Sequence, residues 1–334
     1  QKMRWRGFPS MDQHTDIAVC AHVACWSILR HYSECYASQR ELLVHDIKVM
    51  AHQFDPGGLV PGNGLDVYEA ERVFLAAGTY PLLVSKSITT PDDFYAQLLA
   101  YLDSGFPLFA AMEGRGHAIV IVGRSWQDVR AVSGNAWDRV SGLTVIDDNY
   151  LPYRWVPAKA TTGAEYSAQD IDRFIVALPE KIYYPATAVE AYAKTFAKFL
   201  RNFITMPAEN ETVVRYFVTT VAAFREFARK NASQLGRELV AAIMQLETAQ
   251  FVWVLEYASP AQWSKGEIAA RAVLDASASP KDATPIWMAH GTGTAIFFDR
   301  SVVPAKADFI NVIPAIGAPL SRMEQNLRPI NARP

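Results

Sequence analysis

Cysteine is scarce in this chain of 334 residues, which has three, all between positions 20 and 35. An odd number of cysteines cannot pair completely within one chain, and this argues against a small secreted domain held together by disulfides. No signal peptide is recognisable in the opening residues. The sequence therefore predicts a reducing, cytoplasmic setting.

The chain also lacks an excess of charge of either sign and any long apolar run. Its 32 basic and 34 acidic residues leave a formal net charge of −2, so we expect neither nucleic acid nor a membrane surface as a partner. No stretch reaches the roughly 18 uninterrupted apolar residues of a membrane helix. Half of the residues are hydrophobic, which is enough for one large or two ordinary domains.

The first half of the sequence mixes helical and strand patterns. Apolar residues at helical spacing follow Cys20, and Thr90-Pro91 followed by two acids is a typical helix start. Apolar runs of strand length follow Gly105 and His117. We expect residues 125–141 to be a polar insertion and residues 170–178 to be the strand that closes the sheet. The expected helices are 20–32, 40–50, 65–77 and 91–104, and the expected strands are 80–84, 106–112, 118–122, 142–147 and 170–178.

The pattern changes after residue 182, at a Tyr-Tyr-Pro segment, and we place a domain boundary there. The predicted organisation is α+β: N-terminal helices on a mostly antiparallel sheet in residues 1–182, then a mixed α/β C-terminal domain in residues 183–334. The segment His290–Gly293 is interpreted as a turn. In the C-terminal domain the expected helices are 188–203, 211–230 and 234–246, and the expected strands are 251–256, 267–274 and 294–299.

Three residues in the first half carry the chemistry. Cys20 opens a predicted helix, where unsatisfied N–H groups and the helix dipole favour the thiolate, which is the nucleophilic form. His117 opens a buried strand, and Asp147 follows another strand. If they meet in space, they supply a nucleophile, a base and a group that orients the base. Cys25 competes with Cys20, but it lies more than a turn inside the helix, where the dipole effect has faded.

Five motifs follow one another over about the first half of the chain. They are Gln13 with Cys20–Tyr32, the helix Gly64–Gly78, Gly105-Phe-Pro-Leu-Phe109, Gly116-His-Ala-Ile-Val-Ile-Val-Gly123 and Val145-Ile-Asp-Asp-Asn149. In their order and spacing, these motifs resemble the papain-like cysteine peptidases, most closely the branch that processes bacteriocin leaders.

The resemblance implies a papain-like fold with Cys20 as nucleophile, His117 as general base and Asp147 as its orienter. Asp148 or Asn149 would take the last role in another register. Gln13 would donate to the oxyanion together with the backbone N–H of Cys20.

This chain departs from the family pattern in two places. Six residues separate Gln13 from Cys20 where five are usual, which leaves Asp16 or a backbone group as alternatives for the oxyanion donor. Ala21 stands where the branch has glycine, and the pair Cys25-Trp26 resembles the Cys-Trp pair of plant papains. His22 does not complete a zinc-ligand spacing with the two cysteines, so neither a metal nor a cofactor is predicted.

The sequence thus predicts a cysteine peptidase that hydrolyses an amide bond of a peptide or protein through an acyl-thioester intermediate. An acyl or amide transferase would use the same triad. A second class of function is a non-catalytic module that keeps the fold to bind a peptide or protein. In either case residues 183–334 could hold a protein partner.

Overall fold

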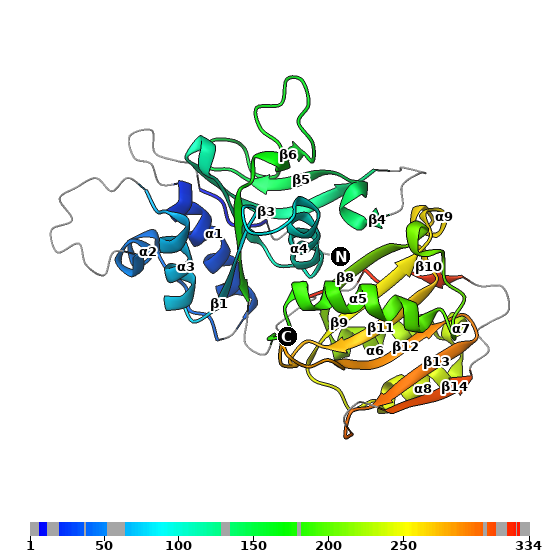
Figure 1. Ribbon diagram of the computed structural model, residues 1–334. Helices are drawn as coiled ribbons and strands as arrows, with labels where there is room; N and C mark the ends of the chain where they lie inside the picture. Colours follow the sequence, from blue (N-terminus) through cyan, green and yellow to red (C-terminus); the bar gives the residue numbers. More distant parts are fainter. Residues whose placement is uncertain are drawn as a thin grey trace, which may run out of the picture.

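The computed structural model describes residues 7–11, 20–36, 38–51, 64–127, 134–178, 182–302, 306–311, 319–324 and 326–327. Over these ranges the chain is α+β, with a six-stranded and a seven-stranded sheet lying side by side and helices packed on both (Figure 1). None of the helices in these ranges combines the length and apolarity needed to cross a membrane.

The first sheet is antiparallel throughout and has the strand order β1-β7-β2-β3-β5-β6. The last strand, β7, lies between β1 and β2 rather than closing the sheet at an edge, because it pairs with both of them. The strands are β1 (Tyr80–Ser85), β2 (Leu108–Met112), β3 (His117–Trp126), β5 (Val140–Ile146), β6 (Arg154–Pro157) and β7 (Arg173–Leu178).

Helices cover both faces of this sheet, as its fully buried strand β2 requires. Phe74 of α3 contacts Phe109, whereas Phe94 of α4 contacts Phe174. Phe174 pairs with Ala110, the neighbour of Phe109, so the two contacts lie on opposite faces. Figure 1 shows α1, α2 and α3 together on one side of the sheet and α4 on the other. The helices are α1 (Cys20–Cys35), α2 (Val44–Ala51), α3 (Val67–Ala76) and α4 (Pro91–Asp103).

Local sequence explains where these helices begin. Asp66 and Glu69 form a reciprocal capping box at the start of α3. Thr90 accepts a hydrogen bond from the backbone N–H of Asp93, and Pro91 occupies the first turn of α4, as the sequence predicts.

The second sheet has the strand order β14-β13-β12-β11-β9-β8-β4. Its edge strand β4 comes from the first half of the chain and runs parallel to β8. Tyr257 donates a hydrogen bond to the carbonyl of Ala193 in α5, whereas Arg271 lies over the ring of Phe227 in α6, so the two helices cover opposite faces. The strands are β4 (Gly134–Asn135), β8 (Val213–Thr220), β9 (Phe251–Ala258), β11 (Ala270–Asp275), β12 (Ile286–Gly291), β13 (Thr294–Asp299) and β14 (Lys306–Asn311).

Shorter elements complete the described part of the chain. A separate antiparallel pair of two-residue strands, β10 and β15, places residues 320–321 beside residues 267–268. The remaining elements are α5 (Ala186–Leu200), α6 (Val221–Lys230), α7 (Ala232–Leu235), α8 (Arg237–Gln245), α9 (Pro260–Ser264), β10 (Glu267–Ile268), β15 (Leu320–Ser321) and the 3-10 turns η1 (Glu113–Arg115), η2 (Ala136–Arg139), η3 (Ala168–Asp170) and η4 (Glu209–Glu211).

The helix predicted over residues 211–230 is wrong in its first half. Residues 213–220 form strand β8, which pairs with β9 along its whole length, and only residues 221–230 are helical. The strand is rich in β-branched valine and threonine, which suit a pleated surface. The predicted helix 234–246 is broken at Gly236, whose φ is +79°. His290 lies in strand β12, not in a turn.

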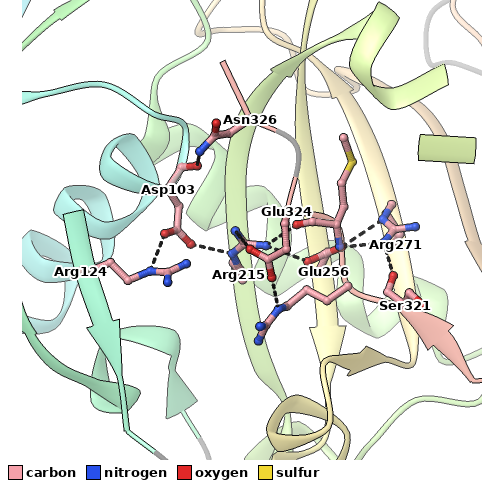
Figure 2. A network of polar contacts seen from close by, with 10 residues as sticks. Asp103, Arg124, Arg215, Glu256, Arg271, Ser321, Glu324 and Asn326 are labelled. Carbon is pink, nitrogen blue, oxygen red and sulfur yellow. Dashed lines mark hydrogen bonds and ion pairs between the residues drawn. The ribbon is translucent and has the colours of Figure 1, made fainter. Parts of the chain in front are cut away.

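The two sheets meet around α4. The hydroxyl of Tyr101 accepts a hydrogen bond from the backbone N–H of Ala186, and that of Ser104, just after the helix, accepts one from Val218. Asp103, the last residue of α4, accepts from both Arg124 and Arg215 (Figure 2). The predicted boundary near residue 182 falls between β7 and α5, and the division into two domains stays a prediction.

Candidate active site

Antiparallel pairing of β3 with β5 brings the start of one strand to the end of the other, since Val120 lies opposite Ile146. His117 is the first residue of β3, and Asp147 directly follows β5. Helix α1, which begins at Cys20, packs against β3. Three segments that are far apart in the sequence therefore converge at one end of the first sheet.

The imidazole of His117 joins the other two side chains. Gly116 adopts a left-handed conformation (φ +58°) that most side chains disfavour, and the turn there leads into the strand. Nε2 of His117 lies 3.0 Å from Oδ1 of Asp147. Cys20 lies beside His117 on the walls of two cavities and interacts with its ring. Because Nε2 faces the carboxylate, Nδ1 is the ring atom left for the thiol.

Both oxygens of the buried Asp147 carboxylate have partners. Oδ1 accepts from His117 and from the backbone N–H of Asn149 at 3.1 Å. Oδ2 accepts from the hydroxyl of Tyr166 and lies 3.7 Å from Nη1 of Arg154. Burial alone would raise the pKa of Asp147, but the hydrogen bonds from His117 and Tyr166 outweigh it and lower the pKa. Asp147 is therefore ionised at neutral pH.

The charge on His117 follows from these contacts. Burial tends to lower its pKa, but the interactions with Asp147 and Cys20 prevail and raise the pKa to about 10. An imidazolium at this place is the counter-ion that a nucleophilic cysteine needs. The geometry thus places an imidazole between the carboxylate of Asp147 and the thiol of Cys20.

Cys20 and Cys25 differ in access, although both are free thiols on α1. Cys25 is completely buried, and burial raises the pKa of its thiol, so it has neither exposure nor a tendency to ionise. Cys20 is partly exposed and lines two cavities. As the first residue of the helix, it also carries a backbone N–H without an intrahelical acceptor, which is available to an oxyanion.

The two cavities share Cys20, Gly116 and His117 in their walls. Cavity A, of about 670 Å³, is bounded by the start of α3 and by apolar residues of β2 such as Phe109 and Ala111. Cavity B, of about 350 Å³, is bounded by Asp147, Tyr150, Glu165 and Tyr166, among others. A chain bound across both cavities would pass the thiol.

Of the four predicted catalytic residues, the structure brings together Cys20, His117 and Asp147. Gln13 and its alternative Asp16 lie outside the described residues. Asp148 is buried with neither carboxylate oxygen hydrogen-bonded to a described residue, and burial raises its pKa to about 6.

Sequence reasoning missed two residues that contact Asp147. Tyr166 lies in the connection between β6 and η3, and Arg154 opens β6. Neither sits in a motif or at an element end with a distinctive pattern. Only the folded chain brings them to the carboxylate.

Metal binding is the other chemistry that this cluster could support. One ligand atom each of His117, Asp147 and Asp148 lies within 4.8 Å of the others. A metal ligated by Asp147 would have to displace hydrogen bonds that already satisfy both of its oxygens. The arrangement therefore suits an imidazole–carboxylate pair better than a metal centre.

A third cavity, of about 740 Å³, lies elsewhere, where the two halves of the chain meet. Its wall includes Asp103, which pairs with Arg124 and Arg215, and also Cys35, whose Sγ lies 3.6 Å from Nε2 of His31. Cys35 is the last residue of α1, where the negative end of the helix dipole disfavours a thiolate, whereas Cys20 is the first. We therefore place the candidate site at Cys20.

No family model, curated protein or solved structure matches this chain. The assignment of the site therefore rests on the geometry of its own residues.

Proposed function

We propose that this chain is a papain-like cysteine peptidase that hydrolyses an amide bond in a peptide or protein. The observation that carries the proposal is the hydrogen-bonded pair of Asp147 and His117 beside Cys20, whose thiol lies at the start of a helix. The two cavities that Cys20 lines support an extended substrate. The three free thiols fit a reducing compartment, and we propose the cytoplasm.

In the first half of the proposed reaction, the thiol proton resides on His117 and the thiolate attacks the carbonyl carbon of the amide. A carbon–sulfur bond forms, and the backbone N–H of Cys20 stabilises the oxyanion. The intermediate collapses as the carbon–nitrogen bond breaks, and the amine leaves with the proton from His117. An acyl thioester remains on Cys20.

Loss of the negative charge on Cys20 assists the transfer of the proton from His117 to the leaving amine. The interaction with Cys20 is among the causes that raise the pKa of His117. When Cys20 is acylated, that contribution disappears, the pKa of His117 falls, and the ring gives up its proton more readily. His117 then removes a proton from water, which attacks the thioester, breaks the carbon–sulfur bond and releases the acid.

The first experiment tests the nucleophile without knowledge of the substrate. The full chain is treated with limiting iodoacetamide at mildly acidic pH, and alkylation of each cysteine is followed by peptide mass spectrometry. We expect Cys20 to react at least tenfold faster than Cys25 and Cys35, because its thiolate has a counter-ion. The fast reaction should vanish in Cys20→Ser and persist in Cys25→Ser, whereas equally slow reaction of all three cysteines contradicts the proposal.

A second experiment tests the reaction. The wild type and Cys20→Ala are incubated with a mixed peptide library in water enriched in oxygen-18, and the products are sequenced by mass spectrometry. Cleavage that requires Cys20 and places oxygen-18 in the new carboxyl group supports hydrolysis. Joined peptides without the label would indicate a transferase, and identical libraries from the two proteins would indicate a module that binds without catalysis.

A further inference from the structure

We propose that Tyr166 and Arg154 are positioning residues for the catalytic carboxylate, so that the working site is a group of five side chains rather than three. The inference rests on the proposed function of the same site and concerns how Asp147 is held. Both residues act through Asp147, at the oxygen that His117 does not use.

The two oxygens of Asp147 have separate partners. Oδ1 serves His117 and the backbone of Asn149, whereas Oδ2 has the Tyr166 hydroxyl as its hydrogen-bond donor among the described residues. Tyr166 is only 6% exposed, so water does not readily replace its hydroxyl. A buried carboxylate oxygen without a donor is unfavourable, because nothing replaces the water that it loses on folding. Tyr166 therefore favours the ionised carboxylate in the orientation that meets the imidazole.

Arg154 is itself fixed in place. Its guanidinium lies 3.6 Å from the ring centre of Tyr150 and 4.8 Å from that of Tyr166, and it pairs with Glu165 at 3.1 Å. These contacts hold Nη1 at 3.7 Å from Oδ2 of Asp147, too far for a hydrogen bond but close enough for charge attraction. Nη1 is buried and has no hydrogen-bond acceptor among the described residues.

Both residues act in the same direction on protonation. A donor and a positive charge beside Oδ2 stabilise the carboxylate relative to the neutral acid. If Asp147 takes up a proton, the imidazolium of His117 loses its counter-charge and the thiolate of Cys20 loses the imidazolium. Tyr166 and Arg154 thereby set the acidic limit of the pH range over which Cys20 is reactive.

The test measures the rate of Cys20 alkylation against pH in the full chain. In Tyr166→Phe we expect the midpoint of the acidic limb to move up by about one pH unit, since a hydrogen bond to a charged group is lost. Arg154→Met should shift it in the same direction by less, and Arg154→Lys should restore most of the wild-type profile. The matched control is Tyr257→Phe, which removes an equally buried tyrosine hydroxyl that donates to the carbonyl of Ala193 and is no partner of Asp147. It should leave the midpoint unchanged.

A rate that falls equally at every pH in Tyr166→Phe, with an unchanged midpoint, would overturn the inference and indicate a structural role. An equal shift in Tyr257→Phe would do the same. If Tyr166→Phe does not fold, the Arg154→Met and Arg154→Lys pair at a partly exposed position supplies the test.

A separate measurement distinguishes failure of this inference from failure of the proposed function. NMR of isotope-labelled histidine follows the titration of His117 directly. Asp148 lies in the same cluster, and burial raises its pKa to about 6, so the titration is followed in an Asp148→Asn background. The low-pH inflection of the His117 signal then reports Asp147 and should move up in Tyr166→Phe even if Cys20 proves unreactive. An unreactive Cys20 with a shifted inflection would refute the peptidase and retain the positioning role, and an unmoved inflection would refute that role.

Discussion

His290 shows how burial alone changes the chemistry of a residue. It lies in β12 directly opposite Arg271, and neither ring nitrogen has a hydrogen-bond partner among the described residues. Burial, assisted by the nearby charge of Arg271, lowers its pKa from 6.5 to about 3. The histidine is therefore neutral at physiological pH and belongs to the core, not to a reactive site.

This burial predicts a pH dependence of stability. Below pH 6.5 the unfolded chain binds a proton at His290 that the folded chain does not bind until about pH 3. As the pH falls from 6.5 to about 3, the free energy of unfolding should therefore decrease by about 1.4 kcal/mol for each pH unit. In His290→Leu this contribution to the slope should disappear, as measured by urea unfolding at pH 7, 6, 5 and 4. The exposed His45→Gln is the control, and an unchanged slope in His290→Leu would contradict the assignment.

At the scale of the element, capping signals proved more reliable guides than apolar periodicity. The start of α4 could be read from Thr90, Pro91 and the acids that follow, because each acts on the local backbone. The stripe of Val214, Phe217 and Val218 was compatible with a helix but lies in β8. This segment forms a strand rather than a helix because β9 pairs with it along its whole length.

The cap of α4 gives a prediction at this scale. Thr90→Ala removes the side-chain acceptor for the N–H of Asp93 and should lower the free energy of unfolding by about 1 kcal/mol. Urea unfolding measures the loss. Thr195→Ala in the middle of α5, where the hydroxyl only bonds back to the carbonyl of Ala191, is the matched control and should change stability by less than about 0.5 kcal/mol. Equal losses in the two variants would show that the cap is not the cause.

At the scale of the whole molecule, a buried ionic network joins the two sheets through the end of α4 (Figure 2). Asp103 accepts from Arg215 at 2.6 Å, and Arg215 contacts Glu256, which in turn pairs with Arg271. The segment near the C-terminus closes the network, since the backbone N–H of Met323 donates to Glu256. Each charge has partners of opposite sign, which buried charges require.

The network predicts that the two halves unfold together. Arg215→Met leaves Asp103 and Glu256 with fewer partners in a buried place and should lower the free energy of unfolding by about 3–5 kcal/mol. The exposed Lys198→Met, which loses only a surface pair with Glu209, should change it by less than about 1 kcal/mol. Circular dichroism and tryptophan fluorescence should follow one urea transition in the wild type. Two separate transitions would contradict coupling of the halves.

Much of the candidate site could be predicted because its residues occupy marked positions. A cysteine at a helix start, a Gly-His pair at a strand start and an acid at a strand end are local features, and Cys20, His117 and Asp147 followed from them. Tyr166 and Arg154 could not be predicted, because the local sequence around them does not indicate a contact with Asp147. The position of β7 inside the sheet could not be predicted either, since an apolar run of residues does not indicate which strands it pairs with.

By itself, the sequence determined which segments are helical or extended where caps, turns and apolar runs act on the nearby backbone. It also determined the order in which thiol, imidazole and carboxylate follow one another. The tertiary structure alone decided which strands pair and that α4 contacts both sheets. It alone also placed Tyr166 and Arg154 beside the second oxygen of Asp147. These features depend on contacts between residues far apart in the chain, which stabilise the fold only when both partners have been brought together.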